Sequence, residues 1–272
     1  MSSYVRTTAG TVGIAIISIF ALLPFYIMMI MGTYQNEDLF QKIVLVPGNY
    51  LLQNLQTVAD SRFDLVYVNS LIVSIASTVL SVFVSAFAGF AFAKHEFKYK
   101  KKIFAGVLLT MMIPGQLGLV AYVIEMRSLG LSGTLVPLIL PWMANAFGVF
   151  WMTQFIRGAV PTEVLESARM DGCSDIGVFF RIVLAFIYPA ITTLSLLVFL
   201  WSWNNYLLPL IMINKPELFT IPLGINSLGT AYRTDLAAQI LGLTLGTLPV
   251  LILFAIGSKS FIRGLTAGSV KG

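Results

Sequence analysis

The sequence is poor in charge, in cysteine and in histidine. Only 11% of its 272 residues are charged, whereas a soluble globular domain carries roughly 25% charged residues. One cysteine, Cys173, excludes a disulfide within the chain. One histidine, His95, is too few for a histidine-based metal centre, and we expect no metal site. These shortages argue against a soluble globular protein and against a disulfide-bonded one.

Long apolar runs take the place of the missing charge. The chain is 57% hydrophobic, with a mean hydropathy of +0.87. Several runs exceed the ~18 residues that mark a membrane-spanning helix, and β-barrels show alternation instead. We therefore expect a single all-α, polytopic membrane domain over residues 1–272. Its six predicted spans are residues 10–31, 66–93, 103–123, 134–156, 182–213 and 236–258.

The distribution of basic residues predicts the orientation of these spans. Most of the 17 Lys and Arg residues fall on the side of the N-terminus, and basic loops favour the cytoplasm. We therefore expect both termini to be cytoplasmic. The loop KHEFKYKKK (94–102) then anchors the topology, and binding of anionic lipid or of a partner is the alternative.

Charge is absent from the predicted spans themselves. Every Asp, Glu, Lys and Arg lies outside them, whereas proton-coupled carriers keep an ionisable relay inside the membrane. Energy for transport is therefore expected from another subunit.

Small residues recur at four-residue spacing, which places them on one helical face. Those of the second span are Ser77, Ser81, Ser85, Gly89 and Ala93. The sixth span carries the pair Gly242 and Gly246. Both patterns suit packing within the chain or against a partner membrane subunit, and the sequence does not decide between them.

The polar run PTEVLESARMDG (161–172) interrupts this apolar chain, within a predicted cytoplasmic loop of residues 157–181. Pro161 suits a helix start and Gly172 a helix end, and Ser174 can cap a second helix. The run is acidic, whereas helices that lie on anionic lipid are basic. We expect a helix, a glycine turn and a second helix that contact a protein.

The residues of this loop resemble the signature of importer permeases of ATP-binding-cassette systems. That signature is EAA, three residues, Gly, nine residues, Ile, one residue, Leu and Pro. Residues 166–168 stand for EAA, and Gly172, Ile182 and Leu184 are in place. Ser167 replaces an alanine, and Ala185 replaces the proline, so the start of the fifth span is expected to be unbroken, although Pro189 follows.

Four further stretches resemble the carbohydrate-uptake branch, specifically its maltose-type second permease. They are NSLIVSIAST (69–78), WSWNNYLLPLI (201–211), TLPVLILF (247–254) and RGLTAGSVKG (263–272). The resemblance implies the type I importer permease fold in a bacterial or archaeal inner membrane. It also implies a second permease, two ATP-binding subunits and an extracytoplasmic solute-binding protein as partners.

Under this resemblance the chain is a transport subunit and not an enzyme. It has no GxxxxGK[ST] stretch, so ATP and Mg²⁺ are expected in the partner ATPases and no cofactor in this chain. The resemblance assigns ATPase coupling to Glu166, Ser167, Ala168, Asp171 and Gly172. It assigns ATPase contact to Thr266, Gly268 and Lys271 in a tail of residues 259–272.

The candidate solute pathway is the run WSWNNY. Trp201, Asn204 and Asn205 are spaced so that they can share a helical face; an indole can stack on a sugar, and amides bind hydroxyls. The competing interpretation is an aromatic belt at the headgroup level, to which Trp142 and Trp151 are also assigned, as belt or packing residues. The expected function is sugar or oligosaccharide import, and the alternatives are another solute (a glycerol phosphodiester, a polyol or an amino acid) or a secondary carrier.

Overall fold

The structure is a computed structural model that describes residues 2–41, 45–229 and 235–267. All the elements of regular secondary structure assigned in those ranges are helices, as expected from the sequence. The chain divides into two compact units. The first comprises Met1–Asp64 and Ile221–Leu248, and the second comprises Leu65–Thr220 and Pro249–Gly272. Two helices, α3 (Phe63–Lys94) and α14 (Leu236–Ala267), begin in the first unit and end in the second.

Of the remaining elements, only α1 is long. Those of the first unit are α1 (Ser2–Met31), α2 (Leu51–Asp60) and α13 (Ile221–Asn226). Those of the second unit are α4 (Lys100–Thr110), η1 (Gly115–Gly118), α5 (Leu119–Ser128), α6 (Val136–Ile139), η2 (Leu140–Ala144), α7 (Ala146–Ala159), α8 (Thr162–Met170), α9 (Asp175–Val178), the π-helical turn η3 (Phe179–Val183), α10 (Leu184–Phe186), α11 (Tyr188–Trp203), α12 (Leu207–Met212) and η4 (Pro216–Leu218).

Three helical segments of the described residues are long and apolar enough to cross a membrane. They are Gly10–Met31, Phe63–Lys94 and Leu236–Ser258, close to the first, second and sixth predicted spans. The other three predicted spans correspond to bent pairs of helices. The pairs are Lys100–Thr110 with Gly115–Ser128 at 88°, Val136–Ala144 with Ala146–Ala159 at 41°, and Asp175–Phe186 with Tyr188–Trp203 at 81°.

The bend before α11 corrects the expectation of an unbroken start to the fifth span. Ile187 separates α10 from α11, and Pro189 occupies the first turn of α11. Proline has no N–H to donate, and its ring clashes with the carbonyl group four residues earlier, here that of Ala185. Pro189 therefore breaks the helix even though the signature proline at 185 is absent.

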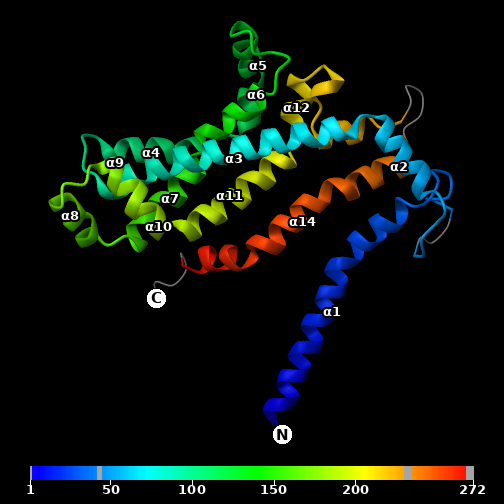
Figure 1. Cartoon of the computed structure of the whole chain (residues 1–272), viewed down its shortest axis with the longest axis horizontal. Coiled ribbons are helices and arrows are strands. Elements are labelled where there is room, and N and C mark those ends of the chain that lie inside the picture. Colours follow the sequence, from blue (N-terminus) through cyan, green and yellow to red (C-terminus); the bar gives the residue numbers. More distant parts are fainter. Residues whose placement is uncertain (1, 42–44, 230–234, 268–272) are drawn as a thin grey trace. The chain divides into compact units, whose positions relative to one another are not determined.

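The small residues of α3 pack against α7 within this chain. Ser77, Ser81 and Ser85 are completely buried, and the amide of Asn145, which caps α7, donates to Ser81 Oγ at 3.1 Å. A Cβ on Gly89 would lie 2.6 Å from Met152 Cβ. Figure 1 shows α3, α7 and α11 side by side. The stripe therefore serves intrachain packing, one of the two uses that the sequence allowed.

The glycine pair of α14 also packs within the chain. A Cβ on Gly242 would lie 3.1 Å from Leu228, and one on Gly246 would lie 2.8 Å from Ile221 of α13. Both glycines therefore allow α13 and the residues after it to approach α14 closely within the first unit.

Candidate functional site

The polar run 161–172 folds as the expected helix and turn. Pro161 is extended, and α8 begins at the next residue. Leu165 and Ala168 of α8 are 1% and 9% exposed. They belong to one buried cluster with Met152 of α7 and Leu194 of α11. The short helix is therefore fixed to the long apolar helices by its apolar face.

Gly172 ends α8 in a left-handed conformation, with φ of +81°. The N–H of Gly172 donates to the Arg169 carbonyl group, and the N–H of Cys173 donates to that of Ala168, each at 3.0 Å. This pair of bonds is the Schellman motif, in which the left-handed residue is usually glycine. No other part of the described chain lies within 4 Å of the position of a Cβ at 172. The requirement for glycine is therefore one of backbone conformation and not of space.

The chain reverses after the turn and enters α9. Ser174 Oγ accepts a hydrogen bond from Gly177 N at 3.2 Å, which is the expected cap. Arg169 Nη2 lies 2.9 Å from Asp175 Oδ1 and joins the two helices across the turn. We name residues 161–178 the coupling knob, after the role that the sequence resemblance implies for them.

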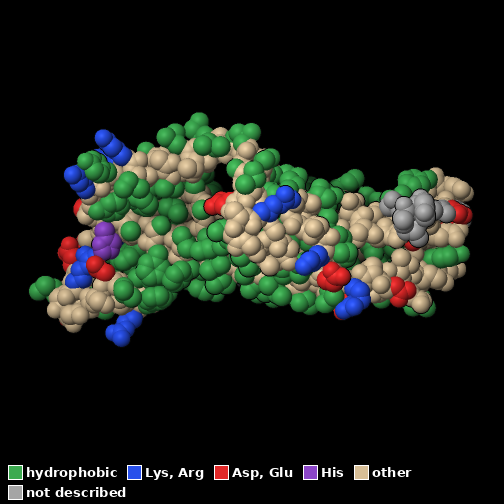
Figure 2. Space-filling view, turned by 90° about the horizontal axis from the view of Figure 1, so that it is seen from above, with side chains coloured by type: hydrophobic (Ala, Val, Ile, Leu, Met, Phe, Trp, Pro, Cys, Tyr) green, Lys and Arg blue, Asp and Glu red, His purple; other side chains and the backbone are tan. Residues whose placement is uncertain are grey.

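Two contacts link the coupling knob to the basic loop after α3. Lys94 Nζ donates to Thr162 Oγ1 at 3.3 Å, and His95 Nδ1 lies 4.0 Å from Asp175 Oδ2. Figure 2 shows the histidine among basic and acidic side chains at one end of this unit, beside a broad apolar surface. Charged side chains therefore gather at this end of the face in view.

The coupling knob exposes both acids and large apolar side chains. Glu166 and Asp171 are exposed, and neither forms an ion pair with the part of the chain that the structure describes. Met170 is 88% exposed and Ile176 is 65% exposed. Ser167 is also exposed, and its hydroxyl donates to the Glu163 carbonyl group within α8 at 2.9 Å.

The predicted tail begins inside a helix. Helix α14 continues to Ala267, so Thr266 lies in helical backbone. Gly268 and Lys271 lie outside the described residues.

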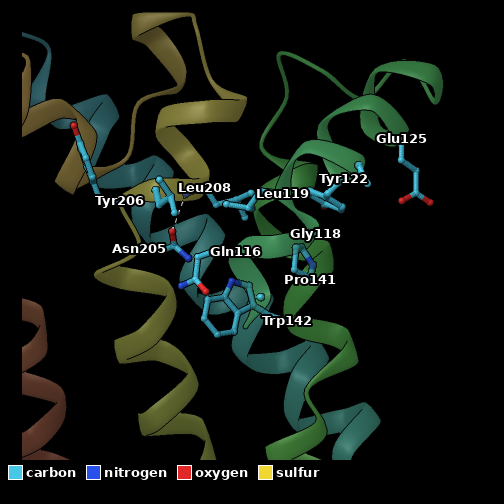
Figure 3. A pocket seen from close by; sticks show the side chains of 13 residues that line it. Gln116, Gly118, Leu119, Tyr122, Glu125, Pro141, Trp142, Asn205, Tyr206 and Leu208 are labelled. Carbon is cyan, nitrogen blue, oxygen red and sulfur yellow. Dashed lines mark hydrogen bonds between the residues drawn. The ribbon is translucent and has the colours of Figure 1, made fainter. Parts of the chain in front are cut away.

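A cavity of about 670 Å³ lies between the bent pair α4–α5 and the segment after α11. It is lined by Gly115, Gln116, Gly118, Leu119, Ala121, Tyr122, Glu125, Pro141, Trp142, Asn205, Tyr206, Leu207 and Leu208. Figure 3 shows the amides of Gln116 and Asn205 next to the ring of Trp142, with Glu125 well apart from them. Rings, amides and one carboxylate therefore surround this space.

Two of these side chains are oriented by backbone groups. The hydroxyl of Tyr122 donates to the Pro137 carbonyl group at 2.7 Å. Asn205 Oδ1 accepts from Leu208 N at 3.2 Å and so caps α12. This hydrogen bond in the first turn of α12 therefore fixes the orientation of the Asn205 side chain, including its amide nitrogen.

The expectation that Trp201, Asn204 and Asn205 share one helical face is wrong. Helix α11 ends at Trp203, so Asn205 lies outside it and lines the cavity, whereas Trp201 and Asn204 do not. Asn204 Nδ2 instead donates to the Leu200 carbonyl group of its own helix at 2.9 Å. Trp201 packs edge-to-face on Phe147, with 5.6 Å between ring centroids.

Trp142, Gln116 and Tyr122 are lining residues that the sequence interpretation missed. Trp142 was expected to be a belt or packing residue, and it contacts both the core and the cavity. Trp151 is a packing residue whose indole donates to the Ala190 carbonyl group at 3.1 Å. The signal that could have found the cavity is IPGQLG (113–118), because Gly- and Pro-interrupted apolar segments mark binding sites in transporters.

Comparison with known proteins gives a family match over almost the whole chain. The model of the family described as "Binding-protein-dependent transport system inner membrane component" matches residues 4–266. The match includes both the coupling knob and the cavity.

Individual relatives agree with this match. The arabinooligosaccharides transport system permease protein AraQ of Bacillus subtilis (strain 168) is 38% identical over 206 residues, covering 76% of this chain and 73% of AraQ. The lactose transport system permease protein LacG of Rhizobium radiobacter is 30% identical over 274 residues, and the match covers 100% of this chain and 100% of LacG. A chain of a bacterial ABC transporter involved in import of the acidic polysaccharide alginate superposes with a TM-score of 0.77 at 22% identity, covering 96% of this chain and 98% of that one. At that identity the superposition establishes the fold.

Proposed function

This chain belongs to the family of binding-protein-dependent transport system inner membrane components, and we propose that it is one permease subunit of an ATP-driven importer of a sugar or oligosaccharide. It is a transport component and not an enzyme. In this proposal the three long helices and the three bent pairs are six spans of the inner membrane, with both termini in the cytoplasm.

The observation that carries the proposal is the attachment of the coupling knob to the membrane helices. Leu165 and Ala168 share a buried cluster with side chains of α7 and α11. Displacement of the knob therefore displaces those helices, because a close-packed interior transmits strain. A movement driven by ATP in a partner subunit can reach the pathway through this cluster.

The surface of the coupling knob suits a protein partner. Exposed Met170 and Ile176 offer apolar anchors, and methionine is enriched at protein interfaces. Glu166 and Asp171 beside them would be repelled by an anionic leaflet. We infer that this face contacts one of two ATP-binding subunits, which would hold the ATP and Mg²⁺.

The cavity suits a neutral, hydroxyl-rich solute. Trp142 and Tyr122 provide ring faces, and Gln116 and Asn205 provide amides; a few placed polar groups in an apolar lining are typical of small-molecule sites. The described lining has one carboxylate, Glu125, and no Lys or Arg to balance a phosphodiester. A second permease would complete the pathway, and an extracytoplasmic binding protein would deliver the solute.

Charge reversal at Glu166 tests the proposal. Glu166→Lys should reach the membrane at normal levels, because Glu166 is exposed, but should weaken ATPase association and uptake. Like-charge contact at an interface costs on the order of several kcal/mol. Asp60→Lys is the control, since Asp60 is an exposed acid at the end of α2, outside the coupling knob. Normal uptake and ATPase retention by Glu166→Lys would reject the assignment.

A further inference from the structure

A second cavity, of about 930 Å³, lies where the basic loop meets α4. We name it the basic cavity. It is lined by Ala93, Lys94, Glu96, Phe97, Tyr99, Lys100, Lys101, Lys102, Phe104, Ala105, Leu108 and Arg157. It shares no residue with the cavity assigned to solute.

Cationic groups in the basic cavity exceed the acids that could neutralise them. Its one lining acid, Glu96, is engaged by Lys100, with Nζ 2.8 Å from Oε1. Lys101, Lys102 and Arg157 are exposed, and none forms an ion pair within the part of the chain that the structure describes. A compact anion could therefore contact three cations that are not held in an ion pair with a described carboxylate.

The electrostatic field of the basic cavity acts on the acid already there. The hydrogen bond from Lys100 lowers the pKa of the Glu96 carboxyl, and the charges of Lys100, Lys101 and Arg157 lower this pKa further. The anionic form of a group at this position is thus favoured. An external anion entering the cavity would be attracted by the charges of Lys101 and Arg157.

The wall of the basic cavity changes from cationic to apolar along α4. Phe104 and Ala105 lie three and four residues after Lys101, and Leu108 lies four and three residues after them, which places all four on one helical face. The guanidinium of Arg157 lies 5.6 Å from the centre of the Phe104 ring, at the boundary between the two parts. One end of the wall therefore suits a phosphate and the other a hydrocarbon chain.

We propose that the basic cavity binds an anionic phospholipid, with the headgroup phosphate at Lys101, Lys102 and Arg157 and the start of an acyl chain along Phe104, Ala105 and Leu108. Basic pockets between membrane helices bind the headgroups of cardiolipin and similar lipids. The proposal rests on the membrane location of the chain and is independent of the transported solute.

An acidic protein surface is the alternative occupant of the basic cavity, and the apolar part of the cavity wall argues against it. A protein contact would use the cationic rim and leave Ala105 and Leu108 exposed to whatever surrounds α4. That helix is the first half of a bent pair apolar enough to cross a membrane, so its surroundings include lipid. The bond between Lys94 and Thr162 also links this site to the coupling knob, and lipid occupancy should therefore influence coupling.

The test compares lipid binding by the purified, complete transporter in detergent. Phosphatidylglycerol and phosphatidylcholine are titrated separately, and bound lipid is counted by native mass spectrometry. Each charge removed in Lys101→Gln and Lys102→Gln should weaken phosphatidylglycerol binding about fivefold, since one basic side chain near an anionic surface contributes on the order of 1 kcal/mol. Lys98→Gln is the matched control, because Lys98 belongs to the same loop but does not line the cavity.

A second variant tests the cavity without changing charge. Ala105→Trp should obstruct the apolar wall and weaken phosphatidylglycerol binding while ATPase retention stays at the wild-type level. Three results would overturn the proposal: equal binding of both lipids, equal losses in Lys98→Gln and Lys101→Gln, or ATPase loss without lipid loss, which would indicate a protein site. Competition by millimolar inorganic phosphate would also overturn it, because the site would then be a simple anion site.

Discussion

Gly89 of α3 faces Met152 of α7 without room for a methyl group between them. A Cβ at 89 would lie 2.6 Å from Met152 Cβ and 2.9 Å from the backbone nitrogen of Thr153. Met152 and Thr153 are completely buried, so neither can move into solvent. The close approach of α3 and α7 therefore depends on glycine at this position.

Gly89→Ala should destabilise the protein. The added methyl group collides with backbone as well as side chain, and overpacking of this kind costs about 1–3 kcal/mol. The measurement is the thermal midpoint in detergent. Gly106→Ala is the matched control, because Gly106 is also helical and nothing lies within 4 Å of its Cβ position. Equal midpoints for the two variants would contradict the packing assigned to α3 and α7.

Gly172→Ala should leave membrane expression normal and weaken ATPase association. A left-handed residue with a Cβ costs about 1–2 kcal/mol, which is small for the whole protein but sufficient to fray the end of α8. Pull-down of the ATPase from detergent is the measurement.

Gly172→Asn and Gly172→Val separate conformation from bulk. Asparagine tolerates the left-handed region better than other residues with a Cβ, and the space around 172 is open. Asparagine should therefore retain more association than alanine, and valine should retain least. If the losses follow side-chain volume instead, the backbone explanation of Gly172 is wrong.

The coupling knob could be predicted from sequence because its determinants are local. The left-handed glycine, the cap by Ser174 and the apolar positions of α8 all act within a few residues of one another. Local signals of this kind predict the ends of a helix in any fold that places the segment at the surface. The family signature and the physical pattern coincide on Gly172 for this reason.

The cavity could not be predicted in the same way, because it depends on helix breaks. The spacing of Trp201 and Asn205 suggested one face, but the helix ends between them at Trp203. Gln116 lies at the break of the pair that is bent by 88°, and Trp142 lies in η2, at the break of the pair that is bent by 41°. Hydropathy detects the length of an apolar run and carries no information on its bend angle.

Asn205→Leu should impair uptake, and Asn204→Leu should not. Asn205 lines the cavity and caps α12, whereas the Asn204 amide donates to a carbonyl group of its own helix away from the cavity. Asn205→Asp retains the capping oxygen and separates the two roles of this residue. Uptake of labelled solute, normalised to membrane expression, is the measurement. Equal uptake by the two leucine variants would favour an interfacial role for both asparagines.

Trp142 and Trp151 form the last matched pair, one at the cavity and one in the core. Trp142→Leu keeps an apolar side chain but removes the flat ring. It should raise the KM of uptake roughly threefold to tenfold, since an aromatic stacking contact contributes about 0.5–1.5 kcal/mol. Trp151→Phe removes the bond to the Ala190 carbonyl group and should lower stability by about 0.5–1.5 kcal/mol without changing KM. Uptake kinetics and thermal midpoints are measured for both variants. If Trp142→Leu lowers only the midpoint, then Trp142 is a packing residue and the solute passes elsewhere.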